Sequence, residues 1–192
     1  VWQGSKTYNV RLLLKNRVEG RDVEFYDFPV SLVDLGYEKG MFYINNKACD
    51  IDFTPMSPSS TMDDVAKAIN RGVRSIRFTA GSVSEEVLNY CDAEGIFVAL
   101  TAPINSSSSG SSRKRGGNPS NDPGWREEYV ARTLQLYYTT KRHTSVVAYV
   151  LAADSANGIS LYESYLALKS VIDSRPVFYF DGSREWNSDH LK

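Results

Sequence analysis

Cysteine, histidine and long apolar runs are scarce in this sequence of 192 residues. The two cysteines, Cys49 and Cys91, form one disulfide at most, which excludes a disulfide-rich scaffold and leaves the redox compartment open. No apolar stretch approaches the ~20 residues of a transmembrane helix. The 22 basic and 23 acidic side chains give a net charge of −1, so there is no electrostatic basis for nucleic acid or an anionic membrane as a partner.

The rest of the composition is that of an ordinary folded protein. Hydrophobic residues make up 42% and charged residues 23% of the chain, which argues against wholesale disorder. The length allows one or two domains. Because the first residues show neither an initiator methionine nor a signal-peptide pattern, we expect the sequence to be a piece of a longer protein.

Residues 1–40 have the pattern of β-structure. Residues 8–15 and 23–33 are two β-rich runs, and residues 16–20 between them supply turn-forming side chains. A lone hairpin cannot bury a core of its own. We therefore expect these strands to be part of a β-sandwich whose other strands lie elsewhere.

From residue 41 the sequence alternates between strand and helix patterns. We expect strands over residues 41–44, 49–53, 73–79, 96–100, 146–151 and 176–180, and helices over 61–71, 82–95, 123–143 and 161–173. This order predicts a parallel sheet with right-handed crossovers. An open doubly wound sheet remains the alternative to part of a (β/α)₈ barrel, although no Gly-x-Gly-x-x-Gly element follows a strand.

Residues 105–124 form a low-complexity segment rich in serine and glycine. This composition predicts a mobile loop. The basic triplet at residues 113–115 is suited to an acidic partner, but a solvated loop tip is the favoured interpretation.

Several motifs in this order resemble the family-2 glycoside hydrolases, the group containing β-galactosidases, β-glucuronidases and β-mannosidases. Residues 88–98 are similar to the family's Cys-Asp-Glu-x-Gly-Leu-x-Val stretch, and residues 143–151 to His-Pro-Ser-Val-x-x-Trp-Ser-Leu. Further matches lie at residues 40–47, 76–79, 152–158 and 175–177. The resemblance implies the end of an immunoglobulin-like domain over 1–40 and the first part of a catalytic (β/α)₈ barrel, about five parallel strands, over 41–192.

The resemblance also implies where the chemistry belongs. The family's acid/base glutamate, in Asn-Glu after the fourth barrel strand, falls at Asp154, and the asparagine falls at Ala153. Arg77 falls where the family's arginine orients the nucleophile; a local ion pair is an equally good interpretation of it. For Asp154, a helix-capping or loop role is favoured over catalysis.

Other family markers are replaced in this sequence. The histidine after the second strand falls at Ala80, the Gly-Val-Asn-Arg-His stretch at residues 53–57, and Asp-Glu-Ala at residues 100–102. The nucleophile belongs to the seventh strand, and we expect this sequence to end after the fifth. A retaining glycosidase needs two carboxyl groups about 5–5.5 Å apart.

The remaining candidates have structural interpretations. His143 lies at the amino-terminal, non-catalytic end of the expected barrel, where a structural hydrogen bond is favoured, and His190 is in the tail. Tyr43, Tyr149 and Tyr179 are expected in the core rather than as sugar platforms. No metal-ligand spacing or Ser-His-acid set is present, so neither a metal nor another cofactor is expected.

Two functions follow from these expectations. The first is a fragment of a β-galactosidase-like hydrolase that acts on glycans when whole; the second is an inactive relative that binds carbohydrate or serves as a scaffold. The replaced markers favour inactivity for this chain. Since open strand edges invite pairing, we also expect either self-association or coverage of the first and fifth strands by other segments.

Overall fold

A parallel sheet of five strands is the centre of the computed structural model, which describes residues 7–179, 188 and 189. The strands are β6 (Thr54–Met56), β7 (Ser75–Phe78), β8 (Phe97–Thr101), β9 (Val146–Val150) and β10 (Val177–Phe178). They lie side by side in chain order, and each pair is parallel. Consecutive order without reversal excludes the doubly wound alternative and confirms the partial barrel.

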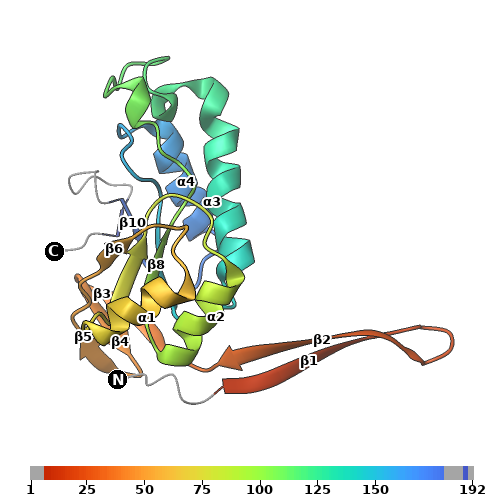
Figure 1. Ribbon diagram of the computed structural model, residues 1–192. Helices are drawn as coiled ribbons and strands as arrows, with labels where there is room; N and C mark the ends of the chain where they lie inside the picture. The colour runs from red at the N-terminus through yellow and green to blue at the C-terminus, as the bar shows by residue number, and fades with distance from the viewer. Residues whose placement is uncertain (1–6, 180–187, 190–192) are drawn as a thin grey trace.

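Four helices cover one face of this sheet (Figure 1). They are α1 (Met62–Asn70), α2 (Glu85–Glu94), α3 (Arg126–Thr140) and α4 (Ile159–Lys169). Thr61 and Asp64 close a reciprocal capping box at the start of α1. The sequence placed the start of the second helix at Ser82, which was wrong: Ser84 is the N-cap, and its hydroxyl accepts the Val87 N–H.

Alternation along the strands divides the core into two clusters. Ile76, Phe78, Val98 and Leu100 pack toward the helices. The opposite, concave face carries Phe97, Ala99, Val150 and Phe178, and it packs against Phe42 and Ile44 of a second sheet. Since successive side chains of a strand point to opposite faces, residues such as Arg77 belong to the concave face.

The second sheet is antiparallel and three-stranded. It consists of β3 (Leu35–Glu38), β4 (Met41–Ile44) and β5 (Lys47–Cys49), in that order. Asn45 and Asn46, both with positive φ, form the two-residue turn between β4 and β5. Tyr43 was expected in the core but is 39% exposed, because β4 turns Phe42 and Ile44 inward and Tyr43 outward.

Strands β1 (Thr7–Lys15) and β2 (Asp22–Ser31) form a separate hairpin that extends away from the rest of the chain (Figure 1). The turn falls within residues 16–21, where the Asn16 side chain accepts the N–H groups of Val18 and Glu19. The two expected strands and their turn are therefore confirmed.

Two expected elements differ in the structure. The first barrel strand was expected over residues 49–53, but β6 occupies Thr54–Met56, in a stretch whose central proline is atypical of a strand. Residues 105–124 were expected to be an irregular loop; they contain three short 3₁₀ turns, Ser107–Ser109, Pro119–Asn121 and Pro123–Trp125. Phe180 and His190 lie outside the described residues.

The outer edge of β10 is covered by the tail. Asp189 donates its N–H to the Val177 carbonyl (2.7 Å), and its carboxylate accepts the Val177 N–H (2.9 Å). The same carboxylate accepts bonds from Tyr165 and Lys169 of α4, each 2.8 Å long. The β10 edge of the sheet is therefore not open. This agrees, for the fifth strand, with the expectation that other segments cover the edge strands.

Candidate functional site

A functional site is expected at the carboxyl ends of the parallel strands, because the loops after the strands of a barrel carry its active-site residues. The chain beyond β9 stays in the sheet for a short distance, since Ala153 forms a parallel bridge with Asn105 after β8. Asp154 follows directly. The structure thus places Asp154 at the carboxyl end of β9.

Asp154 is exposed and has a strained backbone. Its φ is +38°, in the left-handed region that residues other than glycine seldom adopt. Such a conformation costs on the order of 1–3 kcal/mol and persists only when the surrounding contacts impose it. Residues with this kind of strain cluster at functional sites, which makes Asp154 the conspicuous residue of this end of the sheet.

The segment around Asp154 is held by contacts from two other strands. The Tyr179 hydroxyl, after β10, donates to the Ser155 carbonyl. The Ser155 hydroxyl in turn accepts the Ser106 N–H (3.1 Å) from the loop after β8 and donates to the Ala153 carbonyl (3.2 Å). Tyr149 and Tyr179 are buried, as expected, and Tyr179 thereby fixes the loop that carries Asp154.

Arg77 lies in the middle of β7, on the concave face and level with Pro55 and Ala99 of the neighbouring strands. Ala99 is level with Ala148, six residues before Asp154. Two strand spacings of about 4.8 Å and this offset along the strand separate the backbones of Arg77 and Asp154 well beyond a contact distance. The structure therefore puts both residues on one sheet, with their backbones well apart.

Apolar side chains stand at three positions within the replaced family markers. Pro55 is in β6, Ala80 follows β7, and Ala102 after β8 is fully buried. The acidic residues in the loops after β6, β7, β8 and β9 (residues 57–61, 79–84, 102–125 and 151–158) are Asp122 and Asp154. Asp122 caps a 3₁₀ turn through the Gly124 N–H (3.0 Å). Of these two residues, Asp154 is the one that directly follows the sheet, next to the bridge between Ala153 and Asn105.

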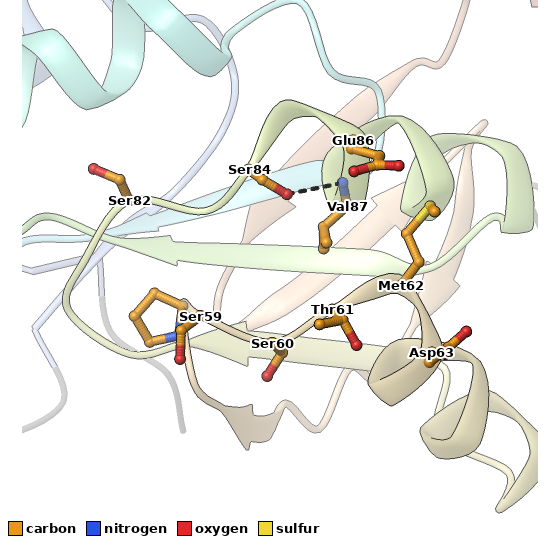
Figure 2. A pocket seen from close by; sticks show the side chains of 10 residues that line it. Ser59, Ser60, Thr61, Met62, Asp63, Ser82, Ser84, Glu86 and Val87 are labelled. Atoms are coloured by element: carbon orange, nitrogen blue, oxygen red, sulfur yellow. Dashed lines mark hydrogen bonds between the residues drawn. The ribbon is translucent and has the colours of Figure 1, made fainter.

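A cavity of about 450 Å³ opens between the loops after β6 and β7 (Figure 2). Hydroxyl groups line it, but the Thr61 and Ser84 hydroxyls are engaged in capping α1 and α2. Neither Asp154 nor Arg77 lines this cavity. It lies outside the concave face and does not extend the candidate site.

His143 has the structural role that the sequence favoured. It is 2% exposed, and its Nδ1 lies 2.7 Å from the Asp92 carboxylate of α2. The other Asp92 oxygen accepts the Ser145 N–H (2.8 Å). These contacts tie α2 to the start of β9, at the end of the sheet opposite Asp154.

Residues 7–179, 188 and 189 contain neither a metal-binding cluster nor a membrane-spanning helix. Within that part of the chain, no group of three or more His, Cys, Asp and Glu side chains is placed to hold a metal ion. Its helices are all too short or too polar to cross a bilayer. Cys49 and Cys91 are free thiols.

The parallel strand order agrees with the comparison of the sequence with known families. The model of the TIM-barrel domain of glycosyl hydrolases family 2 matches residues 56–191. The chain belongs to glycosyl hydrolases family 2. The family's barrel domain thus covers β6 to β10, while β1 to β5 precede the matched residues.

The family-2 relatives are much longer than this chain. A β-galactosidase of Arthrobacter sp. (strain B7) is 29% identical over 121 residues, which are 63% of this chain and 12% of the relative. A β-galactosidase of Vibrio vulnificus (strain YJ016) is 30% identical over 96 residues, 48% of this chain and 8% of the relative. The chain therefore spans about an eighth or less of these enzymes.

Solved structures show the same family-2 fold. The β-glucuronidase from Ruminococcus gnavus in complex with D-glucaro 1,5-lactone superposes with a TM-score of 0.74 at 15% identity, over 90% of this chain and 31% of that chain. Bacteroides uniformis β-glucuronidase 3 gives a TM-score of 0.68 at 15% identity, over 93% of this chain and 24% of that one. At this identity the likeness shows the fold alone.

Sequence reasoning missed the partners of its own candidates. Asp92 stood in the recognised Cys-Asp motif, and that position was the available signal for the Asp92–His143 contact. Nothing local predicted that Tyr179 holds Ser155, because the two residues are 24 positions apart and belong to different elements. Such pairs emerge only when the strand order is known.

Proposed function

We propose that this chain is a family-2 barrel segment that does not hydrolyse glycosides and that has carbohydrate as its ligand class. The observation that carries the proposal is the pair Ala153–Asp154 at the carboxyl end of β9. Hydrolysis with retention needs two carboxyl groups about 5–5.5 Å apart. The acidic residues of the loops after β6 to β9 are Asp154 and Asp122. Asp122 caps a 3₁₀ turn, so its carboxylate has a structural role and is not the second member of a catalytic pair.

In this proposal Asp154 occupies the acid/base position in a degenerate form. An aspartate carries its carboxyl group one methylene closer to the backbone than a glutamate, and a displacement near 1 Å costs on the order of 10²-fold in rate. Ala153 removes the side-chain amide of the family motif. Arg77, on the concave face of β7, occupies the nucleophile-orienting position.

Carbohydrate is supported as the ligand class by the ligands of the structural neighbours. The β-glucuronidase from Ruminococcus gnavus is recorded in complex with D-glucuronic acid and with D-glucaro 1,5-lactone. The fold that it shares with this chain places the loops after the strands at the same end of the sheet. A barrel end that keeps its shape while its family markers are replaced is suited to binding without turnover.

The test is a turnover assay with 4-nitrophenyl β-galactoside and 4-nitrophenyl β-glucuronide. We expect no release of nitrophenol above a buffer blank from the chain or from Asp154→Ala. Release by the chain that Asp154→Ala abolishes would overturn inactivity. Calorimetric titration with galactose and glucuronic acid then separates the two remaining functions, since binding supports a carbohydrate-binding module and its absence supports a scaffold.

A further inference from the structure

A basic turn, formed by residues 112–118, projects from the loop after β8. Figure 1 shows this loop at the end of α3 and α4 that lies away from the β1–β2 hairpin. The basic turn presents Arg113, Lys114 and Arg115, which are all exposed. Residues 105–121 contain no acidic side chain, so the charge of this segment is of one sign.

The backbone of the basic turn closes on itself. The Asn118 N–H donates to the Ser112 carbonyl (3.0 Å), and the Gly117 N–H donates to the Lys114 carbonyl (2.9 Å). Gly116 has a φ of +73°, in the left-handed region that favours glycine. A Cβ atom on Gly117 would lie 2.9 Å from the Lys114 carbonyl oxygen, so this position has no room for a side chain. The two glycines thus form a tight turn that carries the basic side chains.

The basic turn is anchored to the body of the chain. Asn118 is fully buried, and its side chain donates to the carbonyls of Ser106 (2.9 Å) and Gly110 (2.7 Å). The Gly116 N–H donates to the Asn121 carbonyl (3.2 Å), which adds a second anchor. A segment that is already ordered loses little conformational entropy when a ligand binds. A fixed turn, and not the mobile loop that composition predicted, therefore presents the basic triplet.

Two of the three cations have no carboxylate within ion-pair distance in the described part of the chain. The ion pairs of residues 7–179, 188 and 189 include neither Lys114 nor Arg115. Asp122, the first acidic residue after the turn, caps a 3₁₀ turn through the Gly124 N–H (3.0 Å). Like charges that are held close together repel one another, so a partner that carries carboxylates would stabilise the basic turn.

We propose that the basic turn docks a short acidic segment of a partner protein. Carboxylates form charge-assisted hydrogen bonds with guanidinium and ammonium groups. The rest of the chain has more acidic than basic side chains, since the net charge is −1 with the triplet included. An extended polyanion or an anionic bilayer would meet this excess of negative charge, whereas a short segment contacts the turn alone. The proposal does not rest on the proposed function, because its ligand is not a carbohydrate and its test does not involve Asp154.

The experiment measures the fluorescence anisotropy of a labelled peptide of alternating glutamate and glycine as the chain is added at low ionic strength. We expect binding, and we expect Lys114→Ala combined with Arg115→Ala to weaken it about tenfold, because two charge-assisted contacts are lost. Lys47→Ala combined with Arg71→Ala is the matched control, since it removes one lysine and one arginine at exposed positions outside the turn. Salt at about 0.5 M is expected to abolish binding, because screening shortens the reach of exposed charges to a few Å.

A second variant, Gly116→Ala, tests the conformation of the turn. It keeps all three charges, and the added Cβ meets no atom within 4 Å, but the φ of +73° is strained for alanine. We expect Gly116→Ala to weaken peptide binding about threefold, because the turn no longer presents the triplet in its native form. Thermal unfolding of each variant checks that the chain is folded, so that lost binding reports on the turn.

Equal peptide affinity in the two double variants would overturn the proposal, and so would equal binding of a peptide with glutamine in place of glutamate. Unchanged affinity in Gly116→Ala would overturn the role of the ordered turn. Tighter binding to phosphatidylserine vesicles than to the peptide would replace the partner protein with a membrane. Self-association that is lost in Lys114→Ala combined with Arg115→Ala, measured by light scattering, would replace it with a second copy of the chain.

Discussion

Asp92 satisfies two buried groups at once. One of its oxygens contacts His143, which is 2% exposed, and the other accepts the Ser145 N–H. A buried polar group left without a partner costs about 1–3 kcal/mol. Asp92 is therefore the residue through which α2 stabilises the start of β9.

Replacing Asp92 with alanine is expected to lower the free energy of unfolding by about 2–3 kcal/mol, because two buried donors or acceptors lose their partner. Urea unfolding followed by circular dichroism measures this change. Glu94→Ala, at an exposed position of the same helix, is the control and is expected to change stability by less than about 0.5 kcal/mol. Equal effects of the two variants would show that the contact contributes nothing.

Asp154 permits a direct measurement of backbone strain. Asp154→Gly and Asp154→Ala both delete the side chain, so any contact that it makes is lost in both. The φ of +38° is readily adopted by glycine but not by alanine. We expect the glycine variant to be more stable than the alanine variant by about 1 kcal/mol in thermal unfolding. An alanine variant as stable as the glycine variant would show that the strain is absent in solution.

Burial of the Cys91 thiol makes the stability of the folded chain depend on pH. Desolvation, with a smaller effect of Asp92, raises the pKa of Cys91 from 9.0 to about 12. A raised folded pKa contributes stability below pH 9, and this stability is lost as the pH rises toward 12, because the unfolded thiol ionises first. We expect iodoacetamide at pH 8 to modify Cys49 and to leave Cys91 unmodified, as measured by mass spectrometry. Rapid modification of Cys91 in the folded chain would contradict its burial.

Among the elements, the β1–β2 hairpin has one predominantly apolar face and one mixed face. The cross-strand pairs Tyr8–Val30, Val10–Phe28 and Leu12–Tyr26 lie on the same face, since directly opposite residues share a side. The other face carries the ion pair Arg11–Asp27 and the apolar pair Leu13–Phe25. An apolar face opposite a mixed face is consistent with a sheet that has one buried side. We therefore maintain the sandwich over residues 1–40 as a proposal, noting that β3 pairs with β4 across residue 40.

The apolar face is expected to drive self-association of the chain. Leu12→Thr combined with Tyr26→Thr removes the centre of this face, and we expect it to lower the association measured by light scattering. Leu13→Thr combined with Phe25→Thr is the matched control, because these residues are similarly exposed but lie on the opposite face. A monomeric unaltered chain, or equal effects of the two double variants, would count against this interpretation.

The segment over residues 105–124 contains a buried, hydrogen-bonded asparagine that composition does not reveal. Its serines and glycines predicted a mobile loop, yet Asn118 is fully buried and bonded to Ser106, Gly110 and Ser120. A single buried amide organises the whole segment, and amino-acid composition cannot reveal which asparagine is buried. The triplet at residues 113–115 is exposed, as the sequence predicted.

For the whole molecule, the parallel sheet was predictable where apolar runs are continuous. β8 and β9 are buried along their entire length, so their sequences are nearly uniform in hydrophobicity. β6 was placed too early because its three residues, Thr54, Pro55 and Met56, include a proline and lie at the edge of the sheet. Hydrophobic periodicity identifies central strands better than edge strands.

The candidate site was predictable only in part. The sequence resemblance placed Asp154 after the fourth barrel strand, and in the structure Asp154 follows the bridge between Ala153 and Asn105 beyond β9. The strain at Asp154 and the contact between Tyr179 and Ser155 depend on the folded chain, because no local pattern encodes a positive φ at an aspartate or a bond across two strands. The roles of Asp154 and Arg77 in chemistry stay predictions.

The most direct measurement is hydrolysis of 2,4-dinitrophenyl β-galactoside by the purified chain. Its leaving group departs without protonation, so the assay detects a nucleophilic carboxylate even where the general acid is degenerate. With Asp154 and the turn-capping Asp122 as the acidic residues of the described loops after β6 to β9, we expect a rate equal to the buffer blank. The contradicting result is dinitrophenol-releasing activity that co-elutes with the chain in gel filtration and disappears in Asp154→Ala. That result would assign glycosidase chemistry to the end of β9.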